Sequence, residues 1–159
     1  KIYTGKTHFN SINKYGELNI GEMSGVKIIK EIYKNTEEKD FLIDCPPGTA
    51  CTTVSAVEVA DFAIIVVEPS PFGLSDMKLV VQLLRDMKIP FGVVINKFDE
   101  DENIVKKYCD DEKIEIIGTI PFDRKIAETY SKGEIIAEAL PEYRENFETI
   151  LKRVKSYGN

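Results

Sequence analysis

The chain has 159 residues, 43% of them hydrophobic and 30% charged, with a formal net charge of −6. This length fits one compact domain and excludes a pair of full enzyme domains. The acidic balance leaves no broad basic surface for phosphates, so we expect no direct nucleic-acid binding. No apolar run reaches the roughly 18 residues that span a bilayer, and the three cysteines indicate free thiols. We therefore expect a cytoplasmic protein without a membrane partner, and the start at Lys1 rather than Met indicates a fragment.

The first part of the chain alternates short β-favouring stretches with turn residues. Residues 1–10 and 14–20 predict a hairpin or an excursion at a sheet edge. A helical spacing of apolar residues begins at Val26, with Ser24 as a candidate cap, and ends near Asn35.

The rest of the chain alternates short apolar runs with helical periods. The runs are 41–43, 62–67, 91–95 and 114–120, and the predicted helices are 51–59, 74–87, 103–110, 124–131 and 142–157. Strands that are apolar on both faces belong inside a parallel sheet that helices cover. This pattern predicts an α/β fold with three layers, a parallel sheet between helices, in a single domain over 1–159.

The run at 41–43 is followed by Asp44 and then by Pro46, Pro47 and Gly48. A carboxylate there lies at the carboxyl edge of a parallel sheet, where open α/β sheets bind ligands. In nucleotide hydrolases such a carboxylate holds Mg²⁺ or its water, and glycine lets a backbone N–H approach the terminal phosphate. The alternative is an aspartate that ends a strand and caps the following turn.

The run at 91–95 is followed by Asn96 and Lys97. An asparagine side chain presents a donor beside an acceptor, which matches the edge of a purine base. The alternative is an ordinary polar turn between a strand and a helix.

A third polar strand end consists of Pro121, Phe122 and Asp123. Pro121 removes a backbone donor and fixes the chain, so that neighbouring carbonyls can face a ligand. The alternative is a turn before a helix that Asp123 caps. If the strands are parallel, all three polar ends lie on one edge of the sheet.

In their order and spacing these segments resemble the C-terminal half of a MinD/ParA/Mrp-class deviant P-loop ATPase. The matching segments are Asp44–Thr49, Glu68–Pro69, Val93–Lys97, Ile120–Asp123 and Lys132–Glu134. The stretch Ile2–His8 and the turn Gly21–Gly25 are similar to a subgroup that carries an inserted ferredoxin-type domain.

The resemblance implies ATP and Mg²⁺ as cofactors. Asp44 would serve Mg²⁺ and the attacking water, and Gly48 would sense the γ-phosphate. The residues implied to surround adenine are Asn96, Pro121, Phe122 and Asp123, and Lys97 is a further expected cofactor-binding residue. The resemblance also implies a homodimer in the complete protein, [4Fe–4S] clusters in an upstream insert, and an iron–sulfur or redox partner.

The chain departs from this class because it contains no Gly-Lys-Gly-Gly-x-Gly-Lys-Thr loop. Thr4–Thr7 resembles the end of such a loop but lacks the preceding glycine and a following helix, so we interpret it as a decoy. We expect these residues alone to bind ATP weakly and to hydrolyse it negligibly. The first P-loop strand is missing, which predicts one of three outcomes beside the strand that ends in Asp44: a gap, a swapped or dimer-filled strand, or poor solubility.

Two other functions compete with the ATPase. A non-catalytic α/β module that binds or regulates a partner would keep the fold without the loop. A flavodoxin-like or receiver domain is disfavoured because Pro46–Gly48 replaces the acidic pocket or flavin loops that those domains need.

The remaining candidate residues are interpreted as structural. His8 is expected to be solvated or part of the hairpin. Cys45 and Cys51 are too few to complete a metal cluster within one chain, and the alternative is a site shared across a dimer interface. The acidic run 99–102 is expected to begin a solvated helix. The apolar stripe of the last helix, which includes Ile150, is expected to pack on the sheet rather than on a membrane.

Overall fold

The computed structural model describes residues 1–7, 11–22, 24–36, 40–100 and 103–157. The expected roles of His8 and of the second half of the acidic run 99–102 lie outside the described residues. The chain divides into two compact units, Lys1–Ala60 and Asp61–Asn159, and each is described by itself. The expectation of a single domain stays a prediction.

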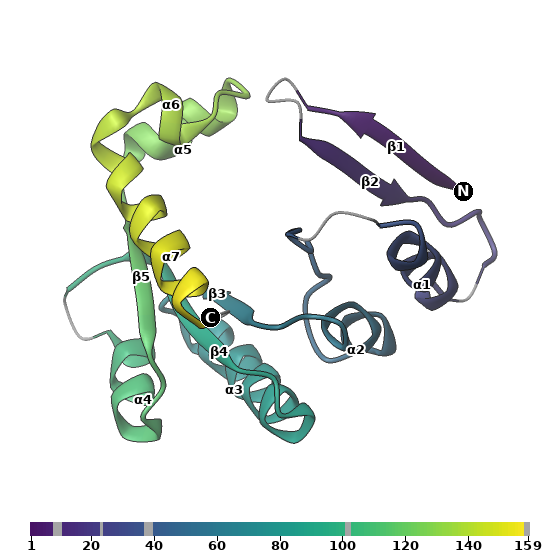
Figure 1. The fold of residues 1–159 in the computed structure, drawn as a ribbon. Helices are drawn as coiled ribbons and strands as arrows, with labels where there is room; N and C mark the ends of the chain where they lie inside the picture. The colour runs from purple at the N-terminus through teal and green to yellow at the C-terminus, as the bar shows by residue number, and fades with distance from the viewer. Residues whose placement is uncertain (8–10, 23, 37–39, 101–102, 158–159) are drawn as a thin grey trace. The chain divides into compact units, whose positions relative to one another are not determined.

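The first unit begins with the expected hairpin. Strands β1 (Ile2–Lys6) and β2 (Ile12–Gly16) pair in antiparallel fashion, with the rings of Tyr3 and Tyr15 stacked at a centroid distance of 5.1 Å (Figure 1). Gly5 and Lys6 are therefore part of a strand and do not open a helix. The interpretation of Thr4–Thr7 as a decoy is confirmed.

Two helices complete the first unit. Helix α1 (Val26–Lys34) agrees with the expected helix, and the Ser24 hydroxyl accepts a hydrogen bond from the Val26 N–H at 3.3 Å. The N-cap position itself is Gly25. Helix α2 (Cys51–Val57) packs against α1.

The strand expected at 41–43 is wrong for this structure. Among the described residues, Phe41–Ile43 pairs with no strand, and the Leu42 side chain is 92% exposed. An apolar run becomes a strand only when neighbouring strands satisfy its backbone groups, and such partners are not a local property of the sequence.

The second unit contains a parallel sheet in the order β3 (Ala63–Val67), β4 (Phe91–Phe98) and β5 (Ile116–Pro121). Val93 and Ile95 of the central strand are 0% exposed and form the middle of the core. This is the expected α/β architecture. Among the described strands β3 pairs with β4 alone, and the Val66 side chain is 62% exposed.

Helices α3 (Pro71–Met87), α4 (Ile104–Glu112) and α7 (Arg144–Tyr157) cover the sheet, with α7 in front of it and α3 behind it in Figure 1. Ile150 of α7 lies against Gly118 of β5, so the last helix packs on the sheet as predicted. Helix α3 begins earlier than expected because Ser70 caps it, accepting from the Gly73 N–H at 3.0 Å, and a proline occupies the first turn.

Short helices connect β5 to α7. They are α5 (Arg124–Ser131), which was expected, α6 (Ile136–Ala139), which was not, and a single 3₁₀ turn at Pro141–Tyr143. Within the described ranges, no helix has the length and apolar character needed to cross a bilayer.

Two lysines end the helices behind the sheet in an unusual backbone conformation. Lys88 follows α3 with φ of 57° and Lys113 follows α4 with φ of 55°, both in the left-handed region. This conformation costs roughly 1–2 kcal/mol for a residue with a Cβ atom, which is why glycine usually occupies it.

Candidate functional site

The carboxyl end of β4 leaves the regular ladder. Ile95 pairs with Thr119 and Phe98 with Pro121, so β4 has one residue more than β5 between these pairs. Lys97 in this bulge has φ of 53°. The bulge places Asn96 and Lys97 beside the end of β5.

The Asn96 side chain is held by its own backbone. Its Oδ1 atom accepts a hydrogen bond from the Lys97 N–H at 3.0 Å, and the side chain is half-buried. Within the described part of the chain, its Nδ2 group donates to no residue. A donor at this place can meet a ring nitrogen or a carbonyl of a base.

An ion pair joins the ends of β3 and β4. The Lys97 Nζ atom lies 2.7 Å from Glu68 Oε1, and both side chains are about half exposed at 52% and 50%. Such an exposed pair contributes about 0–1 kcal/mol to stability. This partner of Lys97 was not predicted, although an acid directly after a buried strand was a readable signal.

Pro121 and Phe122 lie directly beside this bulge. The Phe122 N–H donates to the Phe98 carbonyl at 3.2 Å, which continues the parallel pairing past Pro121. The Phe122 ring is 74% exposed and offers an apolar face. The expected meeting of the polar ends of β4 and β5 on one sheet edge is therefore present in the second unit.

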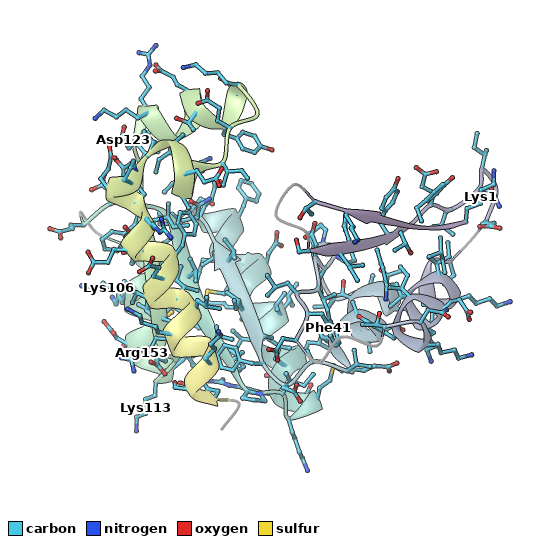
Figure 2. All side chains as sticks on the ribbon, turned by 45° about the horizontal axis from the view of Figure 1, so that its top comes forward. Lys1, Phe41, Lys106, Lys113, Asp123 and Arg153 are labelled. Atoms are coloured by element: carbon cyan, nitrogen blue, oxygen red, sulfur yellow. The ribbon has the colours of Figure 1, made fainter. Side chains whose placement is uncertain are left out.

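Asp123 caps the start of α5 (Figure 2). Its Oδ1 atom accepts from the Lys125 N–H at 2.8 Å, and its Oδ2 atom accepts from the Tyr143 hydroxyl. The bond from Tyr143, and after it the bond from Lys125, hold the pKa of the Asp123 carboxyl below its ordinary value. The bond to Asp123 in turn raises the pKa of Tyr143 to about 12. Asp123 therefore caps a helix, as the alternative interpretation of the sequence expected. A contact of Asp123 with a base stays a prediction.

Asp44 and Gly48 belong to the first unit. The Asp44 carboxylate is exposed and has no hydrogen bond or ion pair with the described residues. Gly48 has φ of +82°, and no atom of the described residues lies within 4 Å of the position that a Cβ atom would take. The turn therefore requires glycine for its backbone conformation and leaves the space above it open.

The Asp44 segment is tied to the helices of its own unit. The Thr53 hydroxyl donates to the Pro46 carbonyl at 3.3 Å, and the Tyr33 ring lies 6.3 Å from the Phe41 ring. The Tyr33 hydroxyl donates to the Ala56 carbonyl of α2 at 2.7 Å, and burial raises the pKa of Tyr33 to about 12.

The Cys45 thiol shows no sign of activation. Burial raises the pKa of the Cys45 thiol, which disfavours the thiolate that would bind a metal or react. Within the described ranges, no three His, Cys, Asp or Glu residues form a group that could hold a metal ion. Asp44 remains suited to be a single carboxylate ligand of an Mg²⁺ ion that arrives with a nucleotide.

Comparison with known proteins gives the chain's relatives. The family described as "ParA: NUBPL iron-transfer P-loop NTPase" matches residues 21–155. An uncharacterized protein of Methanocaldococcus jannaschii is 35% identical over 84% of this chain and 47% of its own length. The iron-sulfur cluster carrier protein of Pyrococcus furiosus is 30% identical over 76% of this chain and 49% of its own length.

One solved structure is similar to this chain both in fold and in sequence. The MinD cell division protein of Aquifex aeolicus is 28% identical, with a TM-score of 0.64, over 81% of this chain and 58% of that one. The chain spans about half the length of the curated relatives it matches.

Proposed function

Because the chain belongs to the ParA family of NUBPL-type iron-transfer P-loop NTPases, we propose that it forms part of the nucleotide site of a magnesium-dependent ATPase. The observation that carries this proposal is the meeting of Asn96 and Lys97 with Pro121 and Phe122 at the carboxyl end of parallel strands. Ligands of open α/β sheets bind at this end.

The adenine base is proposed to lie at the ends of β4 and β5. The free Nδ2 donor of Asn96 would bond an acceptor on the purine edge, and the exposed Phe122 ring would pack on its face. Glu68 balances the charge of Lys97 in the absence of nucleotide. Lys97 would therefore have to leave Glu68 before it could contact the ribose or the phosphates. Asp123 would fix the position of α5 beside the base.

The phosphate end is proposed to involve Asp44 and Gly48. The Asp44 carboxylate, which has no partner among the described residues, would bind Mg²⁺ and orient the attacking water. The bound ion would neutralise the charge that develops on the phosphates during phosphoryl transfer. The backbone N–H in the open turn at Gly48 would contact the γ-phosphate. The loop that cradles the phosphates would come from the rest of the complete protein.

The names of the relatives support an iron–sulfur context for this ATPase. We propose that nucleotide turnover in the complete protein drives the carrying of an iron–sulfur cluster or an electron transfer, in a cytoplasmic homodimer. Relatives of this chain include an iron-sulfur cluster carrier protein and a cytosolic Fe-S cluster assembly factor homolog, and both support this class of substrate.

The test is ATP turnover by the complete protein with Asp44→Asn, compared with Asp40→Asn as a control at a nearby exposed acid. We expect the Asp44 variant to lose turnover on the order of a hundredfold, since an electrostatic partner of the transferring phosphate is removed. Equal rates would remove Asp44 from the mechanism. A complete wild-type protein without turnover would instead support a regulatory module.

A further inference from the structure

A hollow of about 570 Å³ lies in the second unit, at the amino ends of β4 and β5. The ends of three helices, α3, α4 and α7, surround it. Figure 2 shows Lys113 of this hollow and Asp123 at opposite ends of the unit, so the hollow is separate from the proposed base-binding edge. The residues of interest in its lining are Arg85, Lys88, Phe91, Lys113, Glu115 and Tyr157.

The lining is locally positive although the chain has a net charge of −6. Arg85 pairs with Glu112 at 2.8 Å, and Glu115 pairs with Arg153 at 3.6 Å. Lys88 and Lys113 have no acidic partner among the residues that the structure describes. Two ammonium groups of this hollow are therefore left for an anionic ligand.

The choice of lysine at these two positions is not the one that would give the most stable backbone. Both occupy left-handed positions where glycine is less costly. A lysine near a helix end does interact favourably with the helix dipole, and α4 has no basic residue in its last turn, but α3 already has Arg85 there. Strained residues that gather around one cavity point to a use of their side chains.

The floor of the hollow is apolar. Leu84 and Ile114 are 2% and 9% exposed, and the half-buried Phe91 lies between the helix ends. On one side Tyr157 is 44% exposed, stacks on Phe62 at 4.6 Å, and donates its hydroxyl to Glu115. A ligand that matches this surface has an apolar group between carboxylates.

We propose that this hollow binds an acidic segment of a partner protein. Carboxylates of the segment pair with Lys88 and Lys113, and an apolar side chain between them covers the floor. A nucleic acid fits less well, because a continuous line of phosphates offers no aliphatic side chain to cover the apolar floor.

The probe is a short fluorescein-labelled peptide of alternating Glu and Leu, titrated into the full chain with backbone amides followed by NMR. We expect chemical-shift changes confined to residues 84–91, 113–115 and 157, and a loss of binding at high ionic strength. The same peptide with Gln in place of Glu is expected to bind at least about tenfold more weakly. Equal binding of both peptides, or shifts elsewhere, would overturn the proposal.

Charge reversal separates the hollow from the general surface. The double variant Lys88→Glu/Lys113→Glu is expected to abolish peptide binding, whereas Lys106→Glu/Lys107→Glu, with the same change of net charge on the exposed face of α4, is expected to retain it. Equal loss in both would mean nonspecific attraction and would contradict the proposal. Binding of inorganic phosphate in place of the peptide would also contradict it.

A glycine variant separates binding from folding. Lys88→Gly/Lys113→Gly is expected to melt at the same temperature as the wild type or higher, since it relieves the left-handed strain, and still to lose the peptide. A lower melting temperature with unchanged peptide binding would show that the lysines serve the helix ends alone.

Discussion

Tyr33 connects the Asp44 segment to the helices of the first unit through a single hydroxyl and ring. Its hydroxyl donates to the Ala56 carbonyl, and its ring contacts Phe41. We expect Tyr33→Phe to lower the free energy of unfolding by about 1 kcal/mol, because the carbonyl loses its partner. Tyr15→Phe, at an exposed hydroxyl in the hairpin, is the control and should have little effect.

The effect of Tyr33 on stability should depend on pH in the alkaline range. Its folded pKa of about 12 is raised above the ordinary value of about 10, so its contribution is complete below about pH 10 and is lost as pH rises through the folded value. Denaturant unfolding as a function of pH should therefore show that the wild type and Tyr33→Phe converge above pH 10. A constant difference would exclude the tyrosine as the cause.

The contribution of Asp123 to stability should have the opposite pH dependence and should be lost in the acid range. Its folded pKa is lowered, so its contribution is present above its ordinary pKa near about 4 and is lost as pH falls through the folded value. Asp123→Asn keeps a capping oxygen but loses the charge that the Tyr143 hydroxyl meets. We expect this variant to melt below the wild type at neutral pH and to match it in acid, with Tyr143→Phe showing the same trend.

The sequence identified the polar strand ends but not their partners. Asn96, Lys97, Pro121 and Phe122 were predictable, because a polar residue after a buried strand is a local signal. The Glu68–Lys97 pair and the Asp123–Tyr143 bond join distant residues, the latter separated by 20 positions. Such contacts depend on which strands and helices become neighbours, which local patterns do not specify.

At the scale of elements, Gly118 decides how closely α7 approaches the sheet. A Cβ atom at this position would lie 2.4 Å from Cγ1 of Ile150, too close for any side chain without movement. We expect Gly118→Ala to reduce the free energy of unfolding by about 1–3 kcal/mol through overpacking.

Two further variants test whether the contact is the cause. Ile150→Val should recover part of the loss in the Gly118→Ala background, because it removes part of the colliding side chain. Gly5→Ala in the hairpin, where no atom of the described residues lies within 4 Å of the added Cβ atom, should cost little. If Gly118→Ala were as mild as Gly5→Ala, α7 would not pack as described.

The elements that the sequence predicted well have strong local signals. The strands of the second unit have continuous β-branched runs, and α1 has a clear helical period. The start of α3 was placed too late, although Ser70 before Pro71 was a readable cap. Helix α6 has four residues, too few to show a period. The run 41–43 has strand character but no described partner.

At the scale of the whole molecule, the family was predicted from five short segments, and the match to residues 21–155 confirms it. The single domain and the shared rim that would join Asp44 to Asn96 remain predictions. They depend on the arrangement of the two units, Lys1–Ala60 and Asp61–Asn159.

The 159-residue chain by itself should be a poor ATPase. Without a glycine-rich phosphate loop it lacks the backbone cradle that contributes much of the affinity for a triphosphate. Isothermal titration with Mg-ATP should give a dissociation constant well above micromolar, and turnover should be close to the uncatalysed rate. A sub-micromolar constant would show that the loop is dispensable.

The central claim is that Asp44 and Gly48 act on the same nucleotide as Asn96, Pro121 and Phe122. It is tested most directly by mapping Mg-ATP onto the complete protein through backbone amide chemical shifts. We predict that amides at 44–49 shift together with those at 96–98 and 121–123, and that removing Mg²⁺ with EDTA reverses the shifts at Asp44 first. Shifts confined to one of these sets, or absent from both, would contradict the account.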